Sequence, residues 1–154
     1  GLCVVSGSHD KLVKLWNAAT GAEVRTLRGH TGAVTYVEFL PDGTRVVSAL
    51  WDSTIRIWNA ATGAAVFTLR GHVGEIETVS LSPDGNRIVS GGDDCLVKIW
   101  NAATGAEVFT LTGHEDMVSS VAFSSDGTRI VSGSNDTLVM IWNAETGAEV
   151  CTLA

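Results

Sequence analysis

The sequence predicts an all-β fold made of repeated antiparallel units. A Trp-Asn pair recurs every 42 residues, at 16–17, 58–59, 100–101 and 142–143. An Asp-Gly pair, typical of tight turns, recurs in the same phase at 42–43, 84–85 and 126–127. Apolar runs of strand length lie between these turns, which is typical of a repeat architecture built from short strands.

Residues 31–72 show how the first two strands of each unit are predicted. The run Ala33–Leu40 has the length and composition of a strand. It ends at a Pro-Asp-Gly turn at 41–43, because Pro fixes φ and Gly supplies a positive φ. The second strand is predicted at Arg45–Ala49, and a turn around Asp52 ends it.

The third and fourth strands of this unit follow directly. In Thr54–Trp58, Ile55 and Ile57 alternate with polar residues, which is the period of a strand. A turn at 59–63 leads into the fourth strand, Ala65–Leu69. The Ala-rich turn has a helical composition, but it is too short and too close to Gly to nucleate a helix.

The same offsets divide the chain into four units: 1–30, 31–72, 73–114 and 115–154. The first unit lacks the first of the four strands, which we call the innermost strand, and keeps the other three. Fifteen strands are therefore predicted over 1–154. We expect one such domain, with three complete four-stranded units and one three-stranded unit.

The chain resembles the WD-repeat β-propeller family over its whole length. The resemblance depends on the Gly-His pairs at 29–30, 71–72 and 113–114, on an Asp six residues before each repeated Trp, and on the repeat length. Asn stands after each Trp where the family name has Asp, a common substitution. The units would then be propeller blades.

The resemblance implies a buried hydrogen-bonded set of His, Ser, Asp and Trp in each complete blade. These sets are His30, Ser48, Asp52 and Trp58; His72, Ser90, Asp94 and Trp100; and His114, Ser132, Asp136 and Trp142. The partial blade keeps Ser6, Asp10 and Trp16. Such a set gives each buried polar group a partner.

A catalytic reading of the repeated Ser, His and Asp is the alternative. It requires an exposed hydroxyl beside an oxyanion hole, whereas a set repeated in every blade and shared with Trp is structural. We therefore predict no catalytic residue, no metal ligand and no cofactor. The Asp-Gly turns carry too few carboxylates for a calcium loop.

Net charge and cysteine content limit the classes of partner and the cellular compartment that we expect. The net charge of −7 argues against nucleic acid and against an anionic membrane surface. No apolar run is long enough to span a membrane. Cys3, Cys95 and Cys151 form no metal or disulfide pattern, so we expect free thiols in a reducing, cytoplasmic compartment; a single disulfide with one thiol left over is the alternative.

Positions where the repeats disagree are the candidates for partner binding. The residue before the turn Asp is His9, Trp51, Asp93 or Asn135, and the resemblance places it on the top face of a propeller. Further candidates at the start of the innermost strands are Ala33, Thr35, Glu75, Glu77, Met117 and Ser119.

Trp51 stands out because its counterparts are polar, so the blade itself does not need an indole there. We interpret it as a binding anchor; packing over a neighbour or contact with another chain are the alternatives. Glu75, Glu77 and Asp93 would favour a basic peptide, and ordinary solvated charge is the alternative.

These observations predict a non-catalytic scaffold that binds a protein or peptide on the top face, as in the signalling proteins that carry similar repeats. Four blades would leave an open arc, so we expect a head-to-tail homodimer that closes a ring of about eight blades. The alternatives are a lectin-like carbohydrate-binding module, a truncated or engineered propeller fragment whose only activity is assembly, and a hydrolase.

Overall fold

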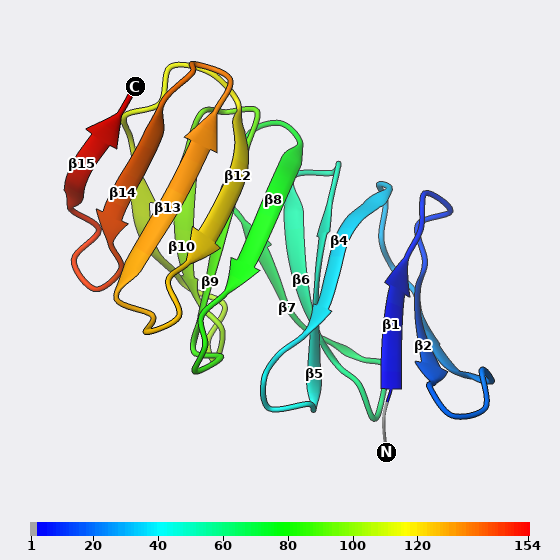
Figure 1. Cartoon of the computed structure of the whole chain (residues 1–154). Coiled ribbons are helices and arrows are strands. Elements are labelled where there is room, and N and C mark those ends of the chain that lie inside the picture. The colour runs from blue at the N-terminus through cyan, green and yellow to red at the C-terminus, as the bar shows by residue number, and fades with distance from the viewer. Residues whose placement is uncertain (1–2) are drawn as a thin grey trace.

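The computed structural model describes residues 3–154, which form fifteen strands in four antiparallel sheets (Figure 1). The first sheet contains β1 (Cys3–Gly7), β2 (Val13–Asn17) and β3 (Glu23–Leu27). The second sheet contains β4 (Val34–Phe39), β5 (Arg45–Leu50), β6 (Thr54–Asn59) and β7 (Ala65–Arg70). The third sheet contains β8 (Ile76–Leu81), β9 (Arg87–Gly92), β10 (Val97–Asn101) and β11 (Glu107–Leu111). The fourth sheet contains β12 (Val118–Phe123), β13 (Arg129–Ser134), β14 (Val139–Asn143) and β15 (Glu149–Leu153).

The predicted fold class is therefore correct: every element is a strand, and consecutive strands pair within a sheet. The Asp-Gly turns adopt the expected conformation, with Gly43 at φ 66°. Strand ends differ slightly from the prediction. β5 extends to Leu50, which is fully buried, and β4 is shorter at both ends than Ala33–Leu40.

Neighbouring sheets pack face to face, and each hydrophobic cluster is shared between two sheets. Ile55 and Ile57 of the second sheet pack with Trp100 of the third, and Trp58 of the second packs with Leu15 of the first. Where two sheets meet, the later sheet thus presents its Trp and the earlier sheet its alternating aliphatic residues.

Close approach and polar contacts fix the spacing of the sheets. A Cβ atom on Gly91 would lie 2.5 Å from Val118 Cγ1, so glycine permits the contact between β9 and β12. Near the lower turns, Arg45 Nη1 donates to the carbonyl of Ala102 at 2.6 Å, and Arg87 makes the equivalent bond to Ala144.

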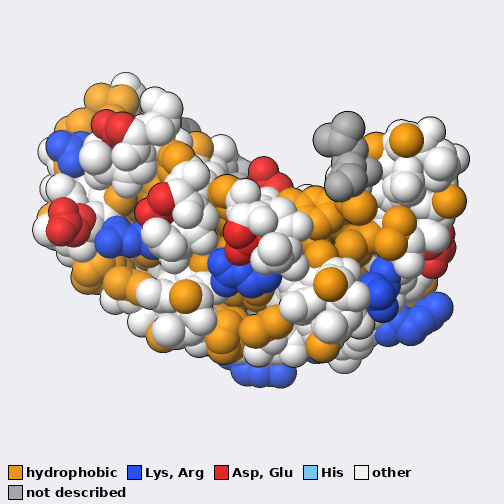
Figure 2. All heavy atoms as spheres, turned by 90° about the horizontal axis from the view of Figure 1, so that it is seen from below, with side chains coloured by type: hydrophobic (Ala, Val, Ile, Leu, Met, Phe, Trp, Pro, Cys, Tyr) orange, Lys and Arg blue, Asp and Glu red, His pale blue; other side chains and the backbone are white. Residues whose placement is uncertain are grey.

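The four sheets follow an arc that is hollowed on one side (Figure 2). The innermost strands β4, β8 and β12 succeed one another along it (Figure 1). Both ends of the arc expose sheet faces that are covered elsewhere. Val89 of the third sheet is 0% exposed, whereas its counterpart Val131 in the fourth is 38% exposed. The structure therefore contains an open arc, and closure of the ring stays a prediction.

Candidate functional site

Trp, Ser, His and Asp are connected by hydrogen bonds inside the third and fourth sheets. In the third sheet, Trp100 Nε1 donates to Ser90 Oγ at 2.9 Å, and Ser90 Oγ lies 2.7 Å from His72 Nε2. His72 Nδ1 lies 2.9 Å from Asp94. The fourth sheet repeats the arrangement, as its three contacts are each 2.8 Å long: Trp142 to Ser132, Ser132 to His114, and His114 to Asp136.

The hydrogen-bonding roles follow from the neighbours. Because the Asp carboxylate accepts, His Nδ1 carries the proton and Nε2 accepts from the Ser hydroxyl, which in turn accepts from the indole. Burial lowers the pKa of His72, while Asp94 opposes that shift. For Asp136, burial favours the protonated acid, but hydrogen bonds from Leu138, Glu115 and His114 hold its pKa at about 2.

The second sheet differs from the expected set in one contact. His30 still lies 2.9 Å from Ser48, which accepts from Trp58. However, His30 Nδ1 is buried without a partner among the described residues, so it does not reach Asp52 as we expected. The Asp52 carboxylate is instead held by two hydroxyls, Thr31 and Thr54.

Sequence differences explain this change. The counterparts of Thr31 are Val73 and Glu115, and those of Thr54 are all Leu, so the other Asp residues meet no hydroxyl there. Burial and the nearby Arg56 together lower the pKa of His30 to about 4, with Asp52 opposing. The first sheet keeps Trp16 Nε1 donating to Ser6 Oγ at 2.8 Å, and Asp10 accepts from the amide of Leu12.

The buried Ser residues lack the geometry of a nucleophile. Ser48, Ser90 and Ser132 are completely buried, and each hydroxyl is engaged by both Trp and His. Acyl-transfer chemistry requires an exposed hydroxyl beside oxyanion-stabilising donors. The arrangement therefore fits a packing role for these sets.

The residues predicted to bind a partner lie together at one end of the sheets, which we call the upper rim. Backbone hydrogen bonds join the residue before each turn Asp to the start of the innermost strand. Trp51 N donates to Ala33 O at 3.2 Å. Asp93 N donates to Glu75 O, and Asn135 N to Met117 O, both at 3.0 Å.

Trp51 is 44% exposed, and its ring meets His9 edge-on with centroids 5.2 Å apart. Trp51 and His9 thus form an aromatic pair across two sheets. Trp51 therefore packs partly over a neighbouring residue, which was one of the alternatives to a binding anchor. Much of its indole nevertheless remains accessible to solvent.

The acidic part of the rim lies on the third sheet. The pKa of Glu77 is raised, first by burial and then by the charges of Asp93 and Glu75. Two hydroxyls at the rim serve the fold as well. Thr35 donates to the carbonyls of Ala49 and Ile76, and Ser119 donates to Gly133.

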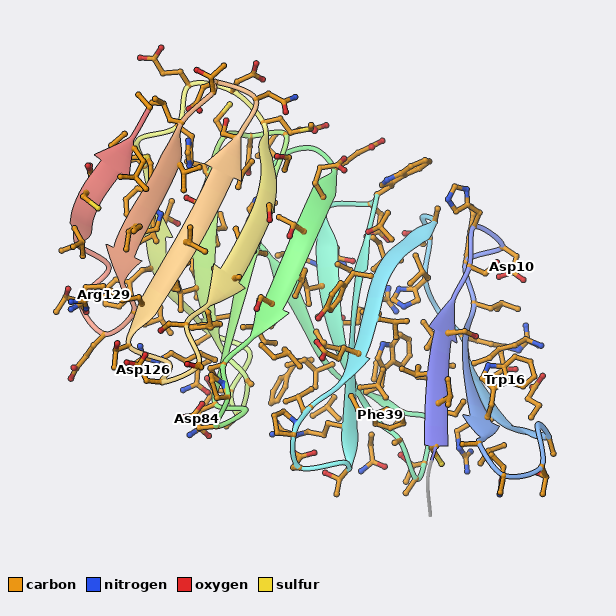
Figure 3. All side chains as sticks on the ribbon, viewed as in Figure 1. Asp10, Trp16, Phe39, Asp84, Asp126 and Arg129 are labelled. Carbon is orange, nitrogen blue, oxygen red and sulfur yellow. The ribbon has the colours of Figure 1, made fainter. Side chains whose placement is uncertain are left out.

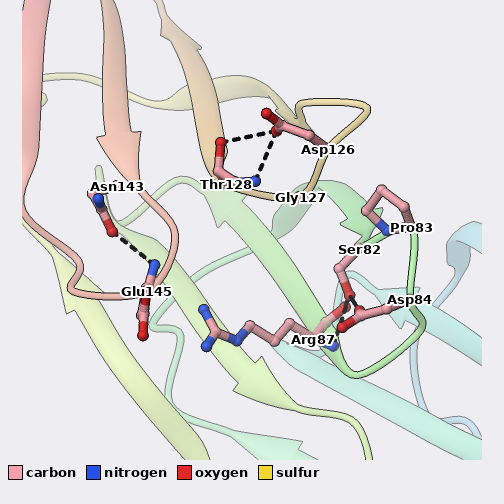
Figure 4. A pocket seen from close by; sticks show the side chains of 9 residues that line it. All are labelled: Ser82, Pro83, Asp84, Arg87, Asp126, Gly127, Thr128, Asn143 and Glu145. Carbon is pink, nitrogen blue, oxygen red and sulfur yellow. Dashed lines mark hydrogen bonds between the residues drawn. The ribbon is translucent and has the colours of Figure 1, made fainter.

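A pocket that sequence reasoning missed lies at the other end of the sheets. It measures about 300 Å³ and lies between the third and fourth sheets (Figure 4). Its lining includes Asp84, Arg87, Asp126 and Glu145. Figure 3 shows Asp84 and Asp126 at the opposite end from Asp10. The sequence feature that could have indicated this pocket is Glu145, which replaces an Ala of the other repeats.

Two of the pocket acids, Asp84 and Asp126, are held by local hydrogen bonds. Hydrogen bonds from Ser124 and Thr128 hold the pKa of Asp126 at about 2, and Ser82 and Asn86 lower the pKa of Asp84. Among residues 3–154, no group of three or more His, Cys, Asp and Glu lies close enough to hold a metal ion. Within the same residues, no helix is long and apolar enough to cross a membrane.

Comparison with known proteins matches these repeats to one family model. The model described as "WD domain, G-beta repeat" matches residues 1–17, 21–59, 63–101 and 105–143. The human protein "Dynein assembly factor with WD repeat domains 1" is 44% identical over 39 residues, which are 25% of this chain and 9% of that protein. "Nuclear distribution protein PAC1" of Arthroderma otae is 51% identical over 43 residues, 28% of this chain and 9% of that protein. The chain therefore spans about a tenth of the length of the curated relatives it matches.

Proposed function

This chain belongs to the WD-repeat family, and from that premise we propose that it is a non-catalytic scaffold which binds a protein or peptide segment on the upper rim. The relatives are WD-repeat proteins named for dynein assembly and nuclear distribution, which supports protein interaction in general. Three free cysteines support a reducing, cytoplasmic setting.

The observation that carries the proposal is the exposure of Trp51. Large aromatic residues with accessible surface are frequent anchors in protein interfaces. The counterparts of Trp51 are His9, Asp93 and Asn135, so neither the turn nor the buried Asp needs an indole at this position.

The neighbouring acids suggest the charge of the partner. Because the charges of Asp93 and Glu75 contribute to the raised pKa of Glu77, an approaching cation relieves repulsion within the rim. We therefore propose a segment with an apolar side chain for Trp51 and a Lys or Arg for the acids. The same charge disfavours nucleic acid and anionic membranes.

Binding can be tested with a fluorescein-labelled peptide that contains Arg and Leu, followed by anisotropy. Trp51→Ala should weaken binding by roughly thirtyfold, as for a hot-spot residue worth about 2 kcal/mol. Val66→Ala is the matched control, since Val66 is also 44% exposed but lies on β7. Equal affinity of both variants would contradict the proposal. Glycan-array binding lost in Trp51→Ala would instead favour the lectin-like alternative.

We also propose that the two end faces of the arc associate head to tail, so that two copies close a ring of about eight sheets. Arg129 is the counterpart of Arg45 and Arg87, which bind a carbonyl of the next sheet, but its Nη1 reaches Thr128 beside it. The equivalent acceptor is the carbonyl of Ala18 in a second copy.

Sedimentation of the 154-residue chain measures this association directly. We expect a dimer, and Val131→Glu should dissociate it by placing a charge on the exposed face. A stable, soluble monomer of 16.1 kDa would exclude the closed dimer.

A further inference from the structure

A cation, a carboxylate and a hydroxyl meet on the outer strands of the first and third sheets. In the third sheet, Glu107 Oε2 lies 3.0 Å from Lys98 Nζ, while its Oε1 accepts from Thr110 at 2.5 Å. In the first sheet, Glu23 makes the same two contacts with Lys14 and Thr26, at 2.7 and 2.5 Å. Each carboxylate thus uses one oxygen for the cation and one for the hydroxyl.

The second sheet keeps the cation and the hydroxyl but lacks the carboxylate. Arg56 pairs with Thr68 across β6 and β7, in the register in which Lys98 pairs with Thr110. The position of Glu107 is occupied by Ala65, which pairs with Trp58. This sheet therefore presents the two partners of a carboxylate that its own chain does not supply.

Arg56 is left without a counterion. Among residues 3–154, its side chain makes no hydrogen bond or ion pair, and its Nε is buried without a partner. The guanidinium lies 5.7 Å above the Trp58 ring, and Nη1 lies 3.0 Å from where a Gly29 Cβ would be. An unpaired cation held in place and partly desolvated gains free energy from an anion.

The empty position is accessible from solvent. The carboxylates that occupy it in the sibling sheets have side-chain exposures of 40% for Glu23 and 36% for Glu107. Ala65 and Thr68 are both exposed. A side chain from another protein can therefore reach the place where the missing Glu would lie.

We propose that Arg56 and Thr68 form a binding site for the carboxylate of an Asp or Glu side chain from a partner protein. The planar guanidinium fork binds a carboxylate through two parallel hydrogen bonds. The sibling pairs show that a two-oxygen group matches this spacing. The site lies on the outer strands and is independent of the upper rim, where the charge is of opposite sign.

The test uses the ¹⁵N-labelled chain and follows the Arg56 Nε–Hε signal together with the backbone amide signals of Thr68 and Thr110, which also report binding in the variants. The probe is the capped tripeptide acetyl-Gly-Glu-Gly-amide at constant ionic strength, with the Gln tripeptide as the uncharged control. We expect a saturable shift with a dissociation constant on the order of millimolar, since one ion pair carries the contact. No saturable shift, or an equal shift with the Gln peptide, would overturn the proposal.

Three variants take their residues from the sibling sheets, so the fold already tolerates them. Arg56→Met copies Met140 and should abolish binding, as should Ala65→Glu, which copies Glu107 and fills the site internally. Glu107→Ala should create a second site at Lys98. Arg70→Ala removes an arginine of the neighbouring strand β7 and should leave binding unchanged.

Several outcomes would contradict the proposal. Binding that survives Arg56→Met or Ala65→Glu, or that is lost equally in Arg70→Ala, would show a diffuse charge effect. Tighter binding of inorganic phosphate than of the Glu tripeptide would refute the carboxylate assignment. Thermal melting verifies folding in every case, and Ala65→Glu should melt at a higher temperature than the unsubstituted chain because it pairs Arg56.

Discussion

Replacing Ser90 by Ala should destabilise the third sheet strongly. Ser90 is completely buried, accepts from Trp100 Nε1 at 2.9 Å and lies 2.7 Å from His72 Nε2. Removal of its hydroxyl leaves a buried donor and a buried acceptor without partners. Each such group costs about 1–3 kcal/mol, so the expected loss in the free energy of unfolding is about 2–6 kcal/mol.

The matched control is Ser6→Ala in the first sheet. Ser6 makes the same bond to Trp16 at 2.8 Å, but Ser6 is exposed and Trp16 is half-buried, so water replaces the lost partner. Its expected cost is about 1 kcal/mol or less. The contrast between the two variants therefore reports burial together with the His72 contact, because the indole–hydroxyl bond itself is common to both.

Thermal melting followed by circular dichroism provides the measurement. For a chain of this size, 1 kcal/mol corresponds to about 2–4 °C in Tm, so Ser90→Ala should lower Tm by at least about 4 °C. A loss no larger than that of Ser6→Ala would refute the structural role of the buried set. Hydrolytic activity that disappears in Ser90→Ala with an unchanged Tm would revive the catalytic reading.

Three further predictions follow from the packing and the charges. Trp58→Ala should cost about 3–5 kcal/mol by denaturant unfolding, and an unchanged midpoint would contradict its place in the core. Gly91→Ala should cost about 1–3 kcal/mol because the new methyl meets Val118, whereas Gly133→Ala, with no atom within 4 Å, should be close to neutral. The folded pKa of His30, about 4, lies below its ordinary value of 6.5, so the unfolded chain binds more protons and stability should fall as the pH drops through that interval. Arg56→Met should raise this pKa in an NMR titration; an unchanged value would show that burial alone sets it.

Most of the fold could be predicted because each strand signal occurs several times in the same phase. A single run such as Thr54–Trp58 is ambiguous in isolation, but its copies at the same offset reduce that ambiguity. The polar contacts between Trp and Ser were expected from the resemblance to the WD-repeat family and not from the strand pattern. The exact ends of strands could not be predicted, because an end such as Leu50 depends on packing against the first sheet.

What sequence reasoning missed was the effect of side chains on their neighbours. The broken contact between His30 and Asp52 results from two Thr hydroxyls that lie 21 and 2 residues from Asp52. Their competition for the carboxylate becomes visible once the turn geometry is known. The lower pocket likewise depends on how two sheets meet, since its residues lie as far apart as Ser82 and Glu145.

Several departures from the repeat lie in or beside the second sheet. Thr31, Trp51, Thr54, Arg56 and Ala65 all lie in or beside it, whereas Ser48 and Trp58 keep their hydrogen bond there. The buried bond between Ser48 and Trp58 is retained, His30 Nδ1 loses its buried partner, and the accessible groups change to an exposed indole and an unpaired guanidinium. A sheet that keeps its Trp–Ser bond and its hydrophobic core but alters its accessible groups has the pattern expected of a binding surface.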